Sequence, residues 1–142
     1  AIEDIRKYNK LHVLILPTSL YGSLIMVGIS RFCEEYGIEV EFHYDINESI
    51  MQRGNLYLLL NGQLGIGLVE VARSATNRGL QIGKDVGVIS YNESYLNEII
   101  LGGLTTVSTD FEQMGRLAAQ MVLSNNFKKI KCDFKLIRRN TF

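Results

Sequence analysis

Short apolar runs alternate with longer amphipathic segments along this chain of 142 residues. Residues 11–16 (LHVLIL) and 55–60 (NLYLLL) are nearly all apolar, which is typical of strands buried on both faces of a parallel sheet. Between them, residues 19–36 repeat apolar side chains at helical spacing, and Gly37 is placed to end that helix. The alternation predicts an α/β fold with a doubly wound, mostly parallel sheet and helices on both faces.

The same alternation continues to the carboxyl end of the chain. Residues 38–44 and 131–137 alternate apolar and polar side chains, which is typical of strands near the edge of a sheet. The other predicted elements are a helix with apolar residues from 64 to 75 that ends at Gly79, a strand over 86–90, a short helical piece over 95–101, a strand over 104–107 and a helix over 111–123. Thr109 and Glu112 have capping-box spacing, so we expect Thr109 to cap the last helix. The chain thus predicts about six strands.

Charge and hydropathy exclude two classes of protein. Lys and Arg number 15 and balance 15 Asp and Glu, which makes the formal net charge zero. A self-sufficient nucleic-acid binder carries a basic surplus, because phosphate neutralisation supplies much of its affinity. No apolar run reaches the roughly 18–20 residues of a membrane span, and no signal segment opens the chain. We therefore expect a cytoplasmic protein with no membrane partner, and two free buried thiols at Cys33 and Cys132 rather than a disulfide.

Catalytic chemistry has little support in the sequence. The chain has two histidines, His12 inside an apolar strand and His43 on the polar face of another, where a core or surface role is expected. There is no nucleophile elbow, no Walker-type phosphate loop and no Cys/His cluster with metal spacing. The glycines at 62, 65 and 67 follow a strand but stand in the wrong order for a dinucleotide site. We therefore predict no enzyme, no catalytic residue, no metal and no cofactor.

The loops that follow the predicted strands carry a different chemistry. Ligands of α/β sheets bind beyond the carboxyl ends of the strands. There the chain places hydroxyls, amides, one carboxylate and two aromatic rings, a set that suits the hydroxyls and C–H faces of a sugar, although polar residues collect in any loop. The predicted ligand-binding residues are Ser19, Tyr21, Asn61, Gln63, Tyr91, Asn92 and Glu93.

Two segments resemble a known family. Residues 79–92 (GLQIGKDVGVISYN) resemble the GLxVPxDVSVxGFDD stretch of lactose-repressor-type regulators. Residues 104–107 (LTTV) and the following 114–119 (MGRLAA) resemble the LTTVxQPxxxxGxxAxxxL stretch of the same family. The form of both segments is especially similar to regulators that join a gluconate-repressor-type winged helix to this effector domain.

The resemblance implies the carboxyl-terminal lobe of a two-lobed, periplasmic-binding-protein-like effector domain. Residues 1–142 would then be a single α/β lobe of a longer regulator, with the helix over 111–123 crossing to the other lobe. This sequence departs from the family pattern where Gly83 replaces proline, Asn92 replaces an acidic residue and Gly62 replaces aspartate. Ser108-Thr109 stands in place of the family's Gln-Pro. The changes at 62 and 92 remove carboxylates that often hold ligand hydroxyls in relatives.

The function that the resemblance implies is a ligand-sensing and dimerisation domain of a bacterial transcription regulator. Its partners would be a small-molecule effector, expected to be a carbohydrate, and a second copy of the chain. DNA would be contacted only through a separate amino-terminal domain absent here. The alternative is a solute-binding protein of a sugar transport system, and the third class is an enzyme with a cryptic site. An isolated lobe would expose the face that its partner covers, so we also expect self-association.

Overall fold

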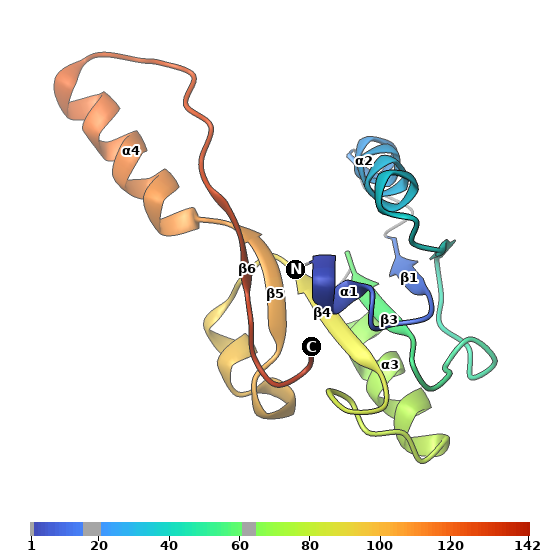
Figure 1. The fold of residues 1–142 in the computed structure, drawn as a ribbon. Helices are drawn as coiled ribbons and strands as arrows, with labels where there is room; N and C mark the ends of the chain where they lie inside the picture. Colours follow the sequence, from blue (N-terminus) through green and yellow to red (C-terminus); the bar gives the residue numbers. More distant parts are fainter. Residues whose placement is uncertain (1, 16–20, 61–64) are drawn as a thin grey trace.

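The computed structural model describes residues 2–15, 21–60 and 65–142, which form one six-stranded sheet (Figure 1). The strand order is β2-β1-β3-β4-β5-β6, in which β1 to β5 pair in parallel and β6 pairs antiparallel to β5. The strands are β1 (Leu11–Leu14), β2 (Val40–His43), β3 (Leu56–Leu59), β4 (Gly87–Tyr91), β5 (Thr105–Thr109) and β6 (Phe134–Ile137). The predicted α/β class and mostly parallel sheet are confirmed, as are the two predicted edge strands.

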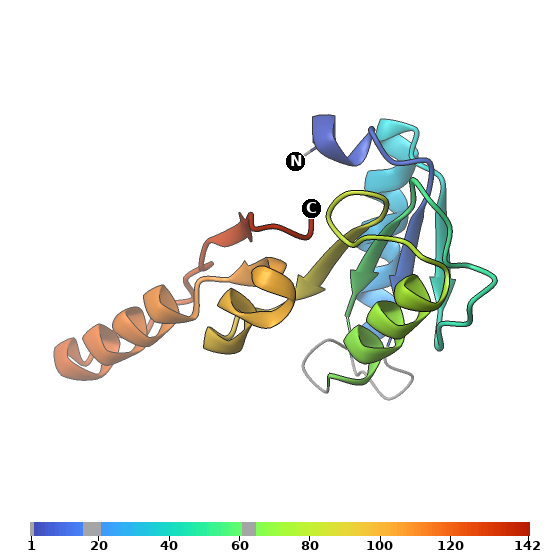
Figure 2. The ribbon, with the colours of Figure 1, turned by 90° about the horizontal axis from the view of Figure 1, so that it is seen from below.

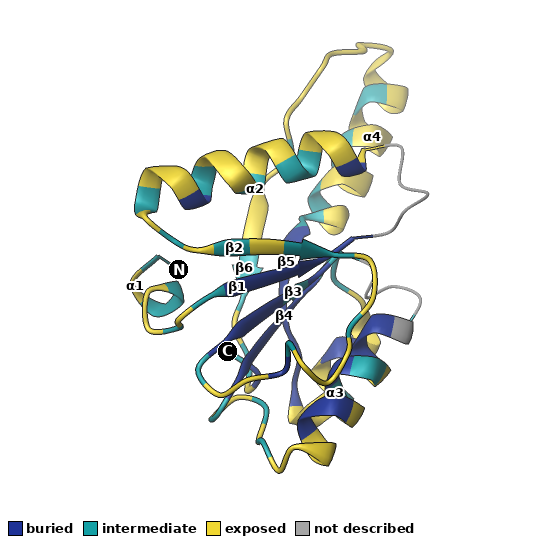
Figure 3. Cartoon of the chain, turned by 90° about the vertical axis from the view of Figure 1, so that its right-hand side faces the viewer, coloured by how far each residue is buried: buried dark blue, intermediate teal, exposed yellow. Residues whose placement is uncertain are grey.

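Helices cover both faces of the sheet, as predicted. Figure 3 shows α2 above the strands and α3 below them. The helices are α1 (Ile2–Ile5), α2 (Gly22–Tyr36), α3 (Ile66–Asn77) and α4 (Phe111–Ser124), with two 3₁₀ helices, η2 (Tyr95–Glu98) and η3 (Ile100–Gly102). The short helical piece predicted over 95–101 is therefore 3₁₀ rather than α. Among the described residues, no helix is both long and apolar enough to cross a membrane.

Two apolar layers hold the sheet between its helices. Alternate side chains of a strand point to opposite faces, so Val13 packs with Cys33 of α2, while Leu14 packs with Val71 and Ala75 of α3. All five side chains are nearly inaccessible to water. The sequences of β1, β3 and β4 are largely apolar without alternation, because each of these strands is covered on both faces.

The structure moves several predicted boundaries by one to three residues. The helix predicted over 19–36 is described from Gly22, and its first expected residues lie outside the described part of the chain. The strand predicted over 104–107 extends to Thr109, because β6 pairs with β5 as far as Thr109 opposite Phe134. The predicted cap at Thr109 is therefore wrong. Asp110 caps α4 instead, and its side chain accepts a hydrogen bond of 2.9 Å from the backbone N–H of Gln113.

Both cysteines are free, as predicted, but only one is buried. Cys33 lies in the core beneath α2, and burial raises the pKa of its thiol. Cys132 is half-buried, since it lies in the segment that leads from α4 to β6 and has no helix above it. The prediction of two buried thiols is thus wrong for Cys132.

Helix α4 projects away from the rest of the molecule (Figures 1 and 2). None of its residues is buried. Its base is held by Gln113, whose side chain both donates to and accepts from Asp133 on the segment that returns to β6. The helix is thus anchored at one end and exposed along its length.

Candidate functional site

The carboxyl ends of the parallel strands frame a cleft of about 650 Å³. Four strands reach it, because β1, β3, β4 and β5 lie side by side and point the same way. Its described lining residues are Ile15, Tyr21, Gly22, Leu24, Ile25, Leu60, Tyr91, Asn92, Thr109 and Phe111. This is the location that the strand-end rule predicts for a ligand site.

The cleft brings together three of the predicted site residues. Tyr21 stands just before α2 with its side chain 68% exposed, and Tyr91 is the last residue of β4. Asn92 follows Tyr91 directly, so an amide and two phenols surround one opening. Ser19, Asn61 and Gln63 lie outside the described residues.

The backbone at Asn92 explains how its side chain reaches the cleft. Its φ of 69° lies in the left-handed region, which asparagine tolerates better than most residues. The backbone N–H of Asn92 donates to the carbonyl of Val107 at 2.9 Å, and its carbonyl accepts from the side chain of Asn97 at 3.3 Å. The chain therefore turns sharply where β4 ends, with its backbone polar groups paired and the Asn92 side chain left at the cleft.

Glu93, the fourth predicted residue within the described part, lies outside this cleft. One of its carboxylate oxygens accepts from Arg139 Nη1 at 3.0 Å and from the Thr106 hydroxyl, and the other accepts from the backbone N–H of Ser94 at 3.0 Å. Burial favours a higher pKa for Glu93, but the hydrogen bonds from Thr106 and Arg139 outweigh it and hold the pKa below its ordinary value. The carboxylate is ionised and ties the end of β4 to the carboxyl-terminal segment.

A second, smaller cleft of about 360 Å³ lies on the other side of β5. It shares Thr109 and Phe111 with the first cleft, and its remaining lining residues are Glu93, Ser94, Tyr95, Glu98, Ser108, Asp110, Glu112, Lys135 and Ile137. Three of its carboxylates are paired with cations: Asp110 with Lys135, Glu93 with Arg139, and Glu112 with Arg116. The charge of this cleft is therefore largely balanced.

Sequence analysis does not identify Thr109 and Phe111 as parts of the site. It predicts Thr109 as a helix cap and Phe111 as the first residue of the helix that follows. A signal for both is nevertheless present, since they stand close to the end of a predicted parallel strand. The structure places them at the point where the two clefts meet.

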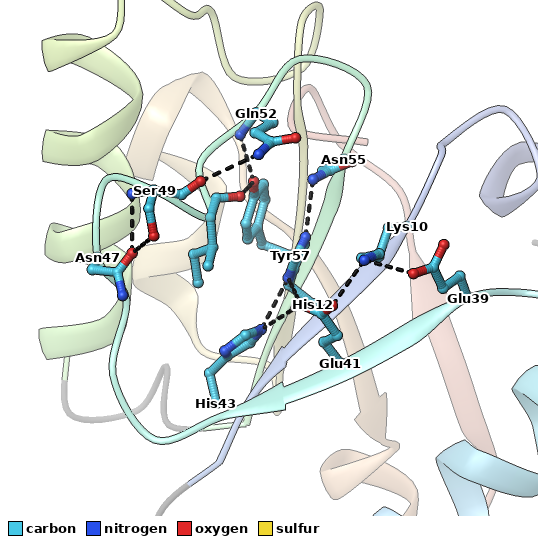
Figure 4. Close-up of polar contacts among 11 residues, drawn as sticks. Lys10, His12, Glu39, Glu41, His43, Asn47, Ser49, Gln52, Asn55 and Tyr57 are labelled. Atoms are coloured by element: carbon cyan, nitrogen blue, oxygen red, sulfur yellow. Dashed lines mark hydrogen bonds and ion pairs between the residues drawn. The ribbon is translucent and has the colours of Figure 1, made fainter.

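Three side chains could hold a metal ion, and none of them lines either cleft. In the described ranges, His12, Glu41 and His43 form the one group of three His, Cys, Asp or Glu residues whose ligand atoms all lie within 4.8 Å of one another (Figure 4). Sequence spacing did not reveal the group, because His12 is separated from the other two residues by about thirty positions.

Comparison with known proteins adds sequence relatives. A family model described as the periplasmic binding protein-like domain matches residues 58–128. The lactose operon repressor of Escherichia coli (strain K12) is 28% identical over 78 residues, which are 55% of this chain and 20% of the repressor. This chain therefore spans only a fifth of that relative's length.

Solved structures with the same arrangement are also found. A LacI family transcriptional regulator from Bifidobacterium animalis subsp. lactis matches 99% of this chain and 58% of its own, with a TM-score of 0.79 and 18% identity. A periplasmic binding protein/LacI transcriptional regulator from Alkaliphilus metalliredigens, complexed with D-xylulofuranose, matches 99% of this chain and 60% of its own, with a TM-score of 0.69 and 17% identity. At these identities the likeness establishes the fold alone. This chain covers somewhat more than half of each of the two matched chains.

Proposed function

We propose that this chain, which belongs to the periplasmic binding protein-like domain family, is the effector-binding lobe of a bacterial transcription regulator. The single observation that carries the proposal is the cleft at the carboxyl ends of β1, β3, β4 and β5, which is lined by two tyrosines and an asparagine amide. The ligand that we propose is a sugar. Relatives support this choice, since one is named for the lactose operon and another was solved with D-xylulofuranose.

The residues of the cleft suit the two surfaces of a sugar. The Asn92 amide offers a donor and an acceptor to a hydroxyl pair, and the rings of Tyr21 and Tyr91 offer apolar faces to C–H groups. We propose that Ser19, Asn61 and Gln63 complete the polar contacts. For Glu93, which lies outside the cleft, we propose a positioning contribution, because its carboxylate holds Arg139 and Thr106 and so fixes the turn that carries Asn92.

The rest of the regulator follows from the same proposal. Residues 1–142 would be one lobe, and α4 would pack against a second lobe that covers the cleft from the other side. Ligand binding would favour the closed pair of lobes and so bias a homodimer between two DNA-binding states, which requires a different ligand affinity in each state. DNA contact would belong to a separate amino-terminal winged helix of a cytoplasmic protein, and the chain itself would catalyse no reaction.

A second candidate is a solute-binding protein of a sugar transport system. It is favoured by the likeness to a structure described as both a periplasmic binding protein and a regulator. The sequence of the full gene separates the two candidates. An amino-terminal winged helix would establish the regulator, and a secretory signal segment would establish the transport protein.

The test of the site uses the intact protein, titrated calorimetrically with a panel of mono- and disaccharides. The informative variant is Asn92→Gly, since glycine removes the amide but adopts the same left-handed backbone. We expect its affinity for the bound sugar to fall by about tenfold, the upper value of one neutral hydrogen bond. The matched control is Asn125→Gly, which makes the same change at another left-handed asparagine, the C-cap of α4, and should leave affinity unaltered. An unchanged affinity in Asn92→Gly would remove Asn92 from the site, and a protein that binds none of the sugars would refute the proposed ligand.

A further inference from the structure

Two neighbouring strands bring His12, Glu41 and His43 to one face of the sheet (Figure 4). In the parallel register of β1 and β2, His12 lies directly opposite Glu41. His43 is two residues beyond Glu41 on the edge strand, so its side chain points to the same face. Strand pairing alone therefore gathers two imidazoles and a carboxylate.

The distances among the three side chains match those of ligands around one ion. His12 Nδ1 lies 3.0 Å from His43 Nε2, and Glu41 Oε2 lies 3.6 Å from each of these nitrogens. A point equidistant from these three atoms is about 2.0 Å from each of them, which is the bond length that Zn²⁺ forms with imidazole nitrogen and carboxylate oxygen. The three atoms can thus surround one ion at bonding distance, with the side facing solvent left for a further ligand.

His12 is held in place by its neighbours. Its ring is buried and stacks on Tyr57 with centroids 5.2 Å apart. Its Nε2 lies 2.9 Å from Nδ2 of Asn55, which donates to it, so Nδ1 carries the ring proton and donates to His43 Nε2. Binding of an ion at Nδ1 would move that proton to Nε2, and a half-turn of the Asn55 amide would let Nε2–H donate to the amide oxygen, the outer contact usual for metal-binding histidines.

Glu41 is oriented by a cation that takes its other oxygen. Lys10 Nζ lies 2.8 Å from Glu41 Oε1 and 2.6 Å from Glu39 Oε1, which leaves Glu41 Oε2 facing the histidines. The Glu41 side chain is 45% exposed, and a polar cavity of about 300 Å³ that includes His12 and Glu41 in its lining opens beside the group. An ion could therefore enter from solvent and keep a water molecule as a fourth ligand.

We propose that His12, Glu41 and His43 form a binding site for a divalent transition-metal ion, with Zn²⁺ as the probe. Two imidazoles and one carboxylate are ligands of Zn²⁺ and its neighbours, whereas Mg²⁺ and Ca²⁺ require oxygen ligands. A bound ion would join the edge strand β2 to β1 in place of the hydrogen bond between the two histidines. The site lies apart from the proposed sugar cleft, so either assignment can fail without the other.

Calorimetric titration of the chain with zinc chloride tests the site, in a Cys132→Ser background that removes the half-buried thiol as a competing ligand. We expect one ion per chain and a melting temperature that is higher with Zn²⁺ than with EDTA. Glu41→Gln and His43→Gln should each weaken Zn²⁺ by at least about tenfold, the loss that even a change outside the ligand shell causes. The matched control is Glu39→Gln, which removes a carboxylate from the same Lys10 but not a ligand, and it should bind Zn²⁺ as before.

The visible spectrum of the Co²⁺-loaded chain gives an independent readout. Bands of a four-coordinate ion with nitrogen and oxygen ligands should be present in the parent chain and absent in His43→Gln. The circular dichroism spectra of Glu41→Gln and His43→Gln in EDTA should match that of the parent chain, since Glu41 and His43 lie on an edge strand. Equal Zn²⁺ affinity in the parent chain and His43→Gln, or no binding in either, would overturn the proposal.

Discussion

Helices α3 and α4 are both amphipathic and similar in length, but they have opposite surroundings. Helix α3 places Leu68, Val71 and Ala75 in the core against the sheet. Helix α4 has no buried residue, although it has an apolar side. Hydrophobic periodicity therefore predicts that a helix has an apolar face to bury, but it does not specify whether the surface that covers this face belongs to the same lobe.

Exposed apolar side chains lie on α4 and on the segment that follows it. Leu123 is 87% exposed and Phe127, on the returning segment, is 70% exposed, whereas Leu14 of β1 is fully covered. The helix is nevertheless well formed, because Asp110 caps it and Asp133 holds its first turn through Gln113. Local interactions thus define α4, and the second lobe that we propose would supply its missing packing.

The largest expected effect comes from making one substitution in both regions. Leu14→Ala should lower the free energy of unfolding by about 2–5 kcal/mol, because it leaves a cavity in the closed core. Leu123→Ala should change that of the monomer by no more than about 0.5 kcal/mol, because the side chain is 87% exposed there. Urea unfolding of the two variants, at a concentration low enough for the chain to be monomeric, measures both values. Equal losses under those conditions would mean that α4 packs within the monomer and would remove the contrast between the regions.

A smaller effect is expected at Glu93, between the core and α4 in degree of burial. Its carboxylate pairs with Arg139, and both side chains are largely covered. Because its pKa is lowered in the folded chain, the stabilisation is complete above the ordinary value of 4.5 and is lost as the pH falls through the folded-state pKa. Glu93→Gln should therefore cost roughly 1–2 kcal/mol at neutral pH and progressively less below about pH 4.5.

The control for this pair is Asp110→Asn, at the base of α4. The pKa of Asp110 is also lowered, chiefly by the hydrogen bond from Lys135, but the Lys135 side chain is 53% exposed, whereas Arg139 is 17% exposed. Asparagine is also a good helix cap, so Asp110→Asn should destabilise the chain less than Glu93→Gln. Urea unfolding as a function of pH gives both comparisons. A parent chain and a Glu93→Gln variant with the same pH profile would show that Glu93 is unpaired in solution.

The smallest effect on stability and the clearest effect on assembly are expected on the exposed face of α4. We expect the chain to self-associate through this face, since several large apolar side chains are exposed together there. The double variant Leu123→Lys with Phe127→Lys should shift the chain to monomer in sedimentation experiments and alter stability by no more than about 0.5 kcal/mol. Ile99→Lys, at a 73% exposed position between the 3₁₀ helices, is the matched control and should leave association unaltered. A parent chain that is monomeric at every concentration would contradict the expectation.

One departure from the family pattern, at Gly83, has a reason in the backbone. Gly83 stands where the resembled stretch has proline, and its φ of 83° is one that proline cannot adopt. A side chain there would also meet the carbonyl of Asn140 in the carboxyl-terminal segment. The departure therefore reflects the local course of this chain.

The candidate site was only partly predictable. Tyr21, Tyr91 and Asn92 could be found because each follows or flanks the end of a predicted strand. The pairing of Glu93 with Arg139 could not, because the two residues are 46 positions apart and only the packed sheet brings them together. The alternation of Glu41 and His43 placed them on one face of a strand, but only the pairing of β2 with β1 added His12.

Local patterns predict the succession of strands and helices along the chain, the parallel sheet, and the edge of the sheet at which a ligand cleft forms. These features follow from periodicity, turn residues and the fixed direction of parallel strands, all of which are local or repeat along the chain. Folding alone establishes which helix face is buried and which is left exposed, where the Glu93 carboxylate is bound, and that two distant histidines meet a carboxylate. These depend on contacts between residues far apart in sequence, which no local pattern encodes.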